Sequence, residues 1–340
     1  MSANTPSRVR TSHVSKYGSA ATLTLQEAES AFWHQFRTAG IVPMHALDTT
    51  CENINNLRTH AERLQLRTVG DLLADATTLL AAAAGVTDLR AGKTSRQTDA
   101  IHTARNTLLA LAAAAALSIP ADPKQIYDAV PKLSVRTRHT RRPLTDDEIV
   151  LCRLHALHLA NTGAHGRRNA CTYAFADAGI APTETTLIRA SHLGYGDTDV
   201  HVTVPANRSL AARTIALEHF HTTVLAPRRA ELGDLLANEL LTYKSRRNQP
   251  GSNPAAASVH GVISRFLTPL GIGGADLAAS CIYLWRLHRV LTDQGPNAAS
   301  QLSGLTGNPG QQYILTLVGD FLPRAEAPAA EPFAGGFLAA

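Results

Sequence analysis

Near the end of the sequence, the segment GNPGQQYILTL (residues 307–317) contains Tyr313, the side chain in this stretch with the clearest chemical potential. A tyrosine hydroxyl can attack a phosphodiester, but a neutral phenol has a pKa of about 10 and is a poor nucleophile at neutral pH. The attack also builds negative charge on the phosphate, which arginine, lysine and histidine donors must stabilise. Without such donors, the ordinary interpretation of Tyr313 is a packed or half-buried structural residue.

Cationic side chains gather in one stretch, PKLSVRTRHTRRP, over residues 131–143. The formal net charge of the chain is +5, with 32 Lys and Arg against 27 Asp and Glu. Such a basic excess favours a nucleic-acid partner, because phosphates attract cations. We therefore predict contacts to double-stranded DNA by Arg96, Arg105, Lys132, Arg136, Arg138, Arg141, Arg142, Arg208, Arg213 and Arg286. The alternative is that the stretch is a solvated linker, and that Arg96 and Arg105 belong to an ordinary polar helix face.

Fifteen histidines and four cysteines raise the question of a metal site. His155 and His158 share one face of an expected helix, but no third ligand has zinc-like spacing. His219 and His221, which flank Phe220, likewise lack a third ligand with zinc-like spacing. The cysteines are scattered and form no CxxC pair, which argues against a disulfide framework or a zinc ribbon. We predict neither a metal site nor a cofactor.

The patterns that mark export or membrane insertion are missing from the sequence. The N-terminus is polar and basic with no apolar core, and no run approaches 18 uncharged apolar residues. We therefore expect no secretory signal, no membrane contact and a cytoplasmic location.

Composition and periodicity predict a mainly α fold with a small antiparallel β-sheet (α+β). Hydrophobic residues are 44% of the chain, and its alanine-rich runs favour helix because alanine loses no side-chain entropy on folding. Apolar spacing indicates helices over residues 24–39, 49–64, 69–83, 95–117, 146–160, 168–178, 228–244, 255–267, 276–294, 297–304 and 309–320, and a short one within 182–190. The alternation of Val200, Val202 and Val204, followed by a turn and a second extended run, predicts a β-hairpin over 199–217.

Changes of composition divide the chain into segments. We predict a flexible basic arm (1–22), a helical domain (23–130), a basic linker (131–143), a second domain (144–322) and a disordered tail (323–340). Ser95 is the expected N-cap of the last long helix of the first domain. The second domain is expected to begin with a capping box formed by Thr145 and Glu148, and the two domains should hinge at the linker.

Several motifs follow one another in an order that resembles the tyrosine recombinase (phage integrase) family, over about residues 24–322. They are SRQTDAIHTARNTLLALAAAAALSIPADP, RRPLTDDEI, AGIAPTETTLIRASHLGYGD, ARTIAL, CIYLWRLHRVLTDQG and LSGLTGNPGQQYI. The resemblance implies a helical, SAM-like core-binding domain and a catalytic-type domain that together clamp duplex DNA, with the linker crossing the duplex. It also implies that Tyr313 lies one residue short of the position of the family's nucleophile.

The same resemblance shows that the family's cationic residues are replaced. Ala181 stands where the first arginine belongs, and the lysine position falls near Asn207 or Arg208. The H-x-L-R positions fall on residues 281–284, with Arg286 two or three places late, and the Gly-His pair becomes Gly304-Leu305. Loss of one such donor typically slows a reaction by about two to three orders of magnitude. We therefore predict that Tyr313 occupies the place of the nucleophile without acting as one.

Three functions remain open at this point. The first is a catalytically degenerate DNA-binding protein with an accessory or regulatory role in DNA integration and recombination. The second is an active, divergent recombinase that uses Tyr313 with Arg189, Arg208 or Arg286 recruited from neighbouring positions. The third is a helical protein–protein interaction module without DNA binding. Beyond DNA, the expected partners are further copies of this chain or another recombinase.

Overall fold

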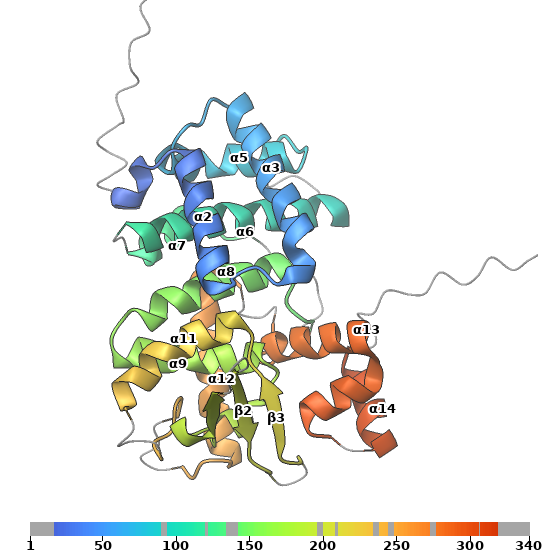
Figure 1. Ribbon diagram of the computed structural model, residues 1–340. Helices are drawn as coiled ribbons and strands as arrows, with labels where there is room; N and C mark the ends of the chain where they lie inside the picture. Colours follow the sequence, from blue (N-terminus) through green and yellow to red (C-terminus); the bar gives the residue numbers. More distant parts are fainter. Residues whose placement is uncertain are drawn as a thin grey trace, which may run out of the picture.

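The computed structural model describes residues 17–89, 94–119, 122–133, 142–195, 200–207, 210–233, 238–243, 248–272, 277–305 and 307–318. Its helices are α2 (Leu25–Ala39), α3 (Leu47–Arg63), α4 (Val69–Ala74), α5 (Ala76–Ala83), α6 (Ser95–Ser118), α7 (Pro123–Ala129), α8 (Asp146–Ala160), α9 (Ala164–Asp177), α10 (Pro182–Thr185), α11 (His219–Leu232), α12 (Asn253–Leu267), α13 (Cys281–Ser303) and α14 (Gly307–Val318). Its strands are β1 (Leu193–Tyr195), β2 (Val200–Val204) and β3 (Arg213–Ala216), and short 3-10 turns include η1 (Ser19–Thr22), η2 (Met44–Ala46), η3 (Ala190–His192) and η5 (Thr268–Leu270). Figure 1 shows α2 to α7 in one half and α9 to α14 with the sheet in the other, with α8 between them.

Local signals explain how the first helices begin and end. The Thr24 side chain accepts a hydrogen bond from the backbone N–H of Glu27, whose carboxylate accepts one from the backbone N–H of Thr24, so the capping box satisfies two otherwise unpaired donors. Helix α2 ends at Gly40, whose φ of 62° lies in the left-handed region that glycine adopts without strain. The chain then turns into η2, which leads directly into α3.

Helix α6 is the central element of the first half. Its residues 105–116 are all buried, because alanine side chains let helices approach it closely from several directions. It packs against α2, α3, α5 and also α8 of the second half. The prediction of Ser95 as its N-cap was wrong by one residue: Thr94 is the N-cap and forms a capping box with Gln97.

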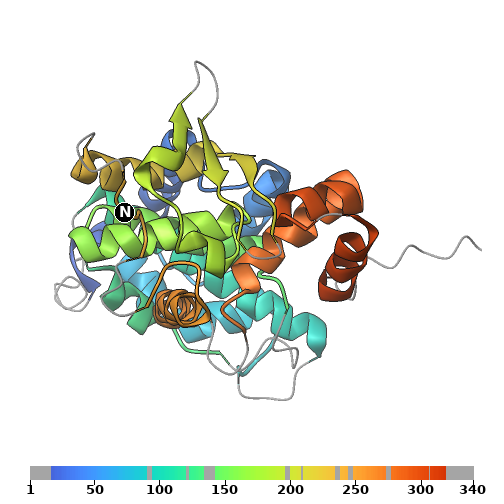
Figure 2. The same ribbon diagram turned by 90° about the horizontal axis from the view of Figure 1, so that it is seen from below.

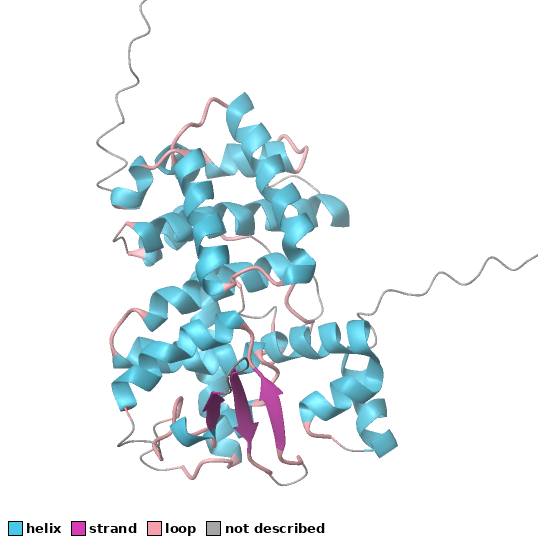
Figure 3. Cartoon of the chain, viewed as in Figure 1, coloured by secondary structure: helices cyan, strands magenta, loops and turns pink. Residues whose placement is uncertain are grey.

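In the described part of the second half, the strands form an antiparallel sheet in the order β1-β2-β3 (Figure 3). Val202 lies opposite Ile215, and both side chains face the core, as do those of Val204 and Leu193. The mainly α fold with a small antiparallel sheet is thus confirmed, and β2 and β3 lie within the predicted hairpin. Strand β1 was not predicted, because three residues are too few to show an alternating pattern.

Two helix predictions near the middle and end of this half need correction. The helix predicted at 228–244 is instead α11, which begins at His219 and ends before Gly233. Pro227 lies inside this helix. Because proline normally marks a helix boundary, the predicted helix was placed after it. The helices predicted at 276–294 and 297–304 form one element, α13, with a kink at Gly295-Pro296.

The two halves are not packed as separate bodies. One hydrophobic cluster of buried residues runs from Tyr17 to Trp285 through both, and α6 lies against α8 at the junction. A smaller cluster joins α14 to both parts of α13, and Figure 2 shows α14 and the end of α13 at the edge of the molecule. The division of the chain at residues 131–143 and the hinge there stay predictions; the structure adds that the halves share a core.

The predicted termini are described only in part. Residues 19–22 form η1, and Tyr17, Ala20 and Ala21 are buried, so the flexible basic arm predicted over 1–22 was wrong for these residues. Their small and aromatic side chains complete the first half's core next to α4 and α6. The rest of the arm and the tail at 323–340 lie outside the described residues.

Candidate nucleic-acid interface

The residues predicted to contact DNA fall into groups with different surroundings. Arg96 at the start of α6 and Lys132 after α7 are exposed, as a phosphate contact requires. Residues Arg136, Arg138, Arg141 and Arg208 lie outside the described residues. The remaining members, Arg105, Arg142, Arg213 and Arg286, are held in ion pairs or in hydrogen bonds to backbone carbonyls, and each is treated below.

Arg105 is a structural residue, and its prediction as a phosphate contact was wrong. Its side chain is 2% exposed, Nε donates to the Pro131 carbonyl at 3.0 Å, and Nη1 donates to the Leu270 carbonyl at 2.8 Å. Burial lowers its pKa to about 10, because charge is unfavourable away from water. Polar residues on an exposed helix face and on a buried one look alike in sequence, and here α8 and η5 cover the face.

Arg142 is likewise buried, so the linker's last arginine does not offer its charge to a partner. Its guanidinium forms a bidentate pair with Glu148, with Nη1···Oε2 at 2.7 Å and Nη2···Oε1 at 2.6 Å. The Glu148 carboxylate also accepts from the backbone N–H of Thr145 at 2.9 Å, which confirms the predicted capping box. The Arg142–Glu148 pair ties the end of the linker to the first turn of α8. The predicted DNA contact by Arg142 is corrected accordingly.

Arg213 lies near the place that the resemblance gives to the catalytic centre. Its Nη1 and Nη2 bind the two oxygens of Glu184 at 2.5 and 2.8 Å, and its Nε donates to the Leu302 carbonyl at 2.5 Å. The Glu184 carboxylate is completely buried and the Arg213 side chain is 9% exposed. The predicted DNA contact by Arg213 was therefore wrong: β3 turns this side chain inward, where a buried carboxylate neutralises it.

Tyr313 stands just outside this pair. Tyr283 is close enough to Glu184, Arg213 and Tyr313 for all three to affect its pKa, which burial raises far above its ordinary value. The Tyr313 side chain itself is 55% exposed on α14, whose opposite face packs Ile314 and Val318 against α13. Tyr313 is therefore not a core residue.

Two of the three arginines that could have been recruited to Tyr313 have partners elsewhere in the structure. Arg189 is exposed and donates through Nη1 to the Asn238 carbonyl, and Arg286 forms an ion pair with Glu218 at 2.5 Å. Arg208 lies outside the described residues. The ion pair occupies one Nη of Arg286, whose side chain is 20% exposed, so the predicted phosphate contact by Arg286 stays a prediction.

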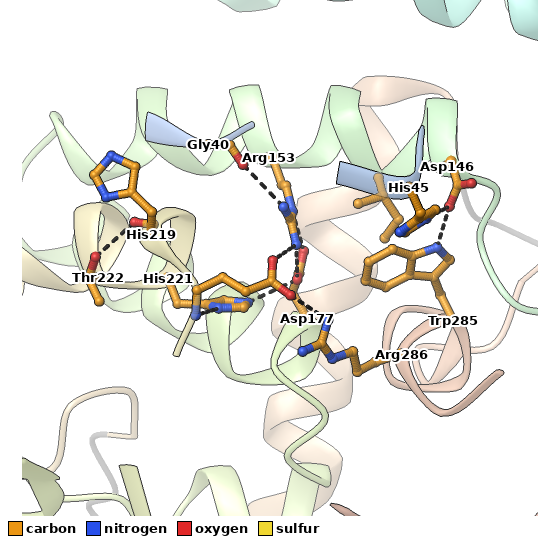
Figure 4. A network of polar contacts seen from close by, with 12 residues as sticks. Gly40, His45, Asp146, Arg153, Asp177, His219, His221, Thr222, Trp285 and Arg286 are labelled. Atoms are coloured by element: carbon orange, nitrogen blue, oxygen red, sulfur yellow. Dashed lines mark hydrogen bonds and ion pairs between the residues drawn. The ribbon is translucent and has the colours of Figure 1, made fainter. Parts of the chain in front are cut away.

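Arg286 leads into a buried polar network that the sequence analysis missed (Figure 4). Arg153 of α8 binds both oxygens of Asp177 at the end of α9, with Nη2···Oδ1 at 2.7 Å and Nε···Oδ2 at 3.0 Å. Arg153 Nη2 also reaches Glu218, which pairs on its other oxygen with Arg286. The partners lie 24 and 65 residues from Arg153 in sequence, so no local spacing could indicate them.

Asp177 is the centre of that network and is completely buried. His221 Nδ1 accepts from the Glu218 backbone N–H at 3.0 Å, so the ring proton is on Nε2, which donates to Asp177 at 3.0 Å. Tyr173 donates its hydroxyl proton to Asp177 at 2.9 Å. Burial alone would raise the pKa of Asp177, but the charge of Arg153 and the hydrogen bond from His221 hold it far below its ordinary range.

Above this network lies an open cleft of about 660 Å³ between the two halves. The segment from the end of α2 to η2 forms one side, and α8, α11 and α13 form the other. Three polar contacts hold the sides together: His219 Nε2 with the Thr38 carbonyl at 2.8 Å, Arg153 Nη1 with the Gly40 carbonyl at 3.2 Å, and His45 with Asp146 at 3.1 Å. Figure 4 shows His45 beside Trp285, which also donates to Asp146.

The histidines that could have suggested a metal have other roles. His155 is buried in an aromatic cluster beside Tyr127 and Phe266, and burial lowers its pKa to about 4. His219 and His221 bind the Thr38 carbonyl and Asp177, as described above. Within the described residues, no group of three or more His, Cys, Asp and Glu side chains could hold a metal ion. Nor is any helix in the described part of the chain long and apolar enough to cross a bilayer.

Comparisons with known proteins give a likeness of fold. No family model and no curated protein matches the chain. The XerH site-specific recombinase bound to palindromic difH substrate is 8% identical, with a TM-score of 0.41, over 87% of this chain and 92% of that one. The XerA recombinase is 12% identical (TM-score 0.40; 88% and 99% covered), and a lambda integrase dimer bound to a COC′ core site is 14% identical (0.39; 91% and 82%). At these values the likeness carries no conclusion about activity, ligands or partners.

Proposed function

We propose that this chain binds double-stranded DNA and does not transfer strands, as a catalytically degenerate protein in DNA integration or recombination. One contrast supports the proposal. Among the described residues predicted to contact DNA, Arg96 and Lys132 are exposed, whereas Arg213 is paired with the buried carboxylate of Glu184. Of these three residues, Arg96 and Lys132 can therefore reach a phosphate without giving up a buried partner, and Arg213 cannot.

The proposal that the chain does not transfer strands rests on the ion pair between Arg213 and Glu184. A phosphate that used this guanidinium would have to take it from Glu184, which is completely buried and would be left as an unpaired charge. Breaking a buried pair in this way is strongly unfavourable. The remaining Arg213 donors are also directed at backbone carbonyls of Ala211 and Leu302, so they do not face the Tyr313 hydroxyl as a preorganised site would.

DNA binding is supported by the cations that remain available. Lys132 is exposed at the start of the basic stretch. Arg136, Arg138 and Arg141 of the same stretch lie outside the described residues and are cationic by sequence. The chain as a whole carries a net charge of +5. Phosphate contacts by such residues release counterions, so binding should weaken steeply with salt and depend little on sequence.

The proposal can be tested by fluorescence anisotropy with a labelled random duplex over a range of salt concentrations. Lys132→Gln should weaken binding and flatten the slope of log K against log salt by about 0.9, the value for one lost phosphate contact. Lys124→Gln is the matched control, because Lys124 is also exposed on the same side of the linker but pairs with Asp128. Equal effects of the two substitutions, or none, would remove Lys132 from the interface.

Strand transfer is tested separately with a nicked duplex and a denaturing gel. We expect no covalent protein–DNA product, and we expect Tyr313→Phe to bind duplex as tightly as the unchanged protein. A covalent product that disappears in Tyr313→Phe would establish the divergent recombinase instead. Absence of salt-dependent duplex binding by a folded protein would favour the protein–protein interaction module.

A further inference from the structure

Two arginines that line the cleft between the two halves keep N–H donors that no protein group in the described part of the chain accepts. An arginine has five N–H donors. Arg286 uses one of them, on Glu218, and Arg289 uses Nη2 on Asp293 at 3.2 and 3.3 Å. In both residues Nε is buried without a hydrogen-bond partner among the described residues, so the donors that can reach a ligand in the cleft are the remaining Nη hydrogens. The two side chains are 20% and 22% exposed, are three residues apart on α13, and line the same cleft.

The opposite side of the cleft adds a further cation and an apolar wall. Arg37, on the last turn of α2, is exposed and lines the cleft. Next to it the wall is formed by Phe36, Val42, Pro43 and Met44, of which Met44 is 74% exposed. A flexible thioether and an aromatic ring are typical of a surface that accepts an apolar or flat group.

Charge and size define what the cleft can hold. Arg153 is neutralised by Asp177, and the other charged lining residues are three arginines (Arg37, Arg286, Arg289) and two carboxylates (Glu218, Asp293), so one positive charge is in excess. A volume of about 660 Å³ lies within the range of small-molecule sites, roughly 300–1,000 Å³. A small anion with an apolar or aromatic body matches both features.

We propose that this cleft binds a small phosphate ester with a flat body, such as a mononucleotide, with the phosphate between Arg37, Arg286 and Arg289 and the body against Phe36 and Met44. Such a ligand contacts both halves of the chain and adds to the three polar contacts that close them. A duplex cannot enter the cleft in this closed arrangement, because those contacts would have to open. Under the proposed DNA-binding function, the ligand therefore acts as an effector that competes with duplex binding.

The experiment uses the full chain and three probes: AMP, inorganic phosphate and adenosine, each measured by isothermal titration calorimetry. AMP should bind saturably and more tightly than phosphate, and adenosine should bind most weakly, because the arginines supply most of the attraction. Arg37→Gln and Arg289→Gln should each weaken AMP binding about tenfold, since each removes one charge-assisted contact. Arg265→Gln is the control: it removes an exposed arginine on α12 that does not line the cleft.

Two results would overturn the inference. One is the absence of saturable AMP and phosphate binding at millimolar concentration. The other is unchanged AMP affinity in Arg37→Gln and Arg289→Gln proteins that melt at the temperature of the unchanged protein. Arg37 has an exposed side chain, so its substitution should leave folding intact even if that of Arg289 does not.

A competition measurement separates this inference from the proposed function. Saturating AMP should raise the apparent Kd for a labelled duplex, whereas adenosine should not. Duplex binding that is indifferent to bound AMP would refute the competition. If the protein binds AMP but no duplex, the nucleotide site is supported and the DNA-binding proposal fails. If it binds duplex but no AMP, the DNA-binding proposal is supported and the nucleotide site fails.

Discussion

Arg153 and Arg289 line the same cleft and differ in what surrounds their guanidinium groups. Arg153 is 1% exposed and all three of its nitrogens are bonded, to Asp177, Glu218 and the Gly40 carbonyl. Arg289 is 22% exposed and uses one nitrogen, on Asp293 of the same helix. The first arginine belongs to the floor of the cleft and holds helices together. The second belongs to its wall and keeps donors available for a ligand.

The comparison shows that an arginine's role depends on the partner that tertiary structure brings to it. Arg213 resembles Arg153, because a buried carboxylate from a distant part of the chain neutralises it. Arg286 is intermediate, since it pairs with Glu218 and still has an unpartnered Nε. The same distinction predicts how strongly each residue should affect stability.

The largest effect is expected from the floor of the cleft. Asp177→Asn removes the charge that neutralises Arg153 in a site without water access, and should lower the free energy of unfolding by about 3–5 kcal/mol. Urea denaturation followed by circular dichroism measures the change. A loss below about 1 kcal/mol would mean that Glu218 alone can compensate Arg153, and that floor and wall do not differ as described.

The buried ion pair of Arg213 and Glu184 should contribute to stability as the Arg153–Asp177 pair does. Arg213→Met leaves Glu184 as an unpaired buried charge and should cost about 3 kcal/mol. The double substitution Arg213→Met with Glu184→Leu should cost clearly less than the sum of the single ones, because neither charge is then left alone. A double-mutant cycle measured by urea denaturation gives the coupling. Additive losses would show that the two residues are not an interacting buried pair.

The pH dependence of stability distinguishes the network's carboxylates from ordinary surface ones. Burial would raise the pKa of Glu218, but chiefly the charge of Arg153, together with that of Arg286, lowers it from 4.5 to about 2. A depressed pKa means that the stabilisation is complete above about pH 4.5 and is lost as the pH falls toward 2. Glu218→Gln should therefore show a shallower loss of stability over this window than the unchanged protein. Parallel curves in a series of denaturant titrations would contradict the assignment.

The smallest effect is expected from the wall. Asp293→Asn removes the partner of Arg289, but the pair is exposed and spaced i, i+4 on α13, where such pairs contribute about 0.3–0.5 kcal/mol. Thermal melting at low and moderate salt measures it. A loss of 2 kcal/mol or more would place Arg289 with the structural arginines and weaken the case for its free donors.

Much of the fold follows from local sequence signals. The capping residues of α8, the alanine-rich α6 and the alternating valines of β2 each indicate their element, because side-chain entropy, capping and strand alternation act within a few residues. The errors lie where this local reasoning is weakest. Pro227 inside α11 misplaced a helix, and β1 is too short to carry a pattern.

The candidate site was much less accessible to prediction. Arg105, Arg142, Arg213 and Arg286 were assigned to one class by their charge, yet each has a different partner in the fold. The network of Arg153, Asp177 and His221 was not foreseen at all, although His221 had been noted as a possible metal ligand. Nothing within one turn or strand of these residues indicates the carboxylate that neutralises them.

The sequence by itself determined the class of the fold and the basic character of the chain. Tertiary structure decided which arginines are buried in pairs and which keep free donors, and that the two halves share a core around α6 and α8. The physical reason is range. Helix propensity and capping act over a few neighbouring residues, whereas the state of a guanidinium depends on desolvation and on charges brought close only by the folded chain.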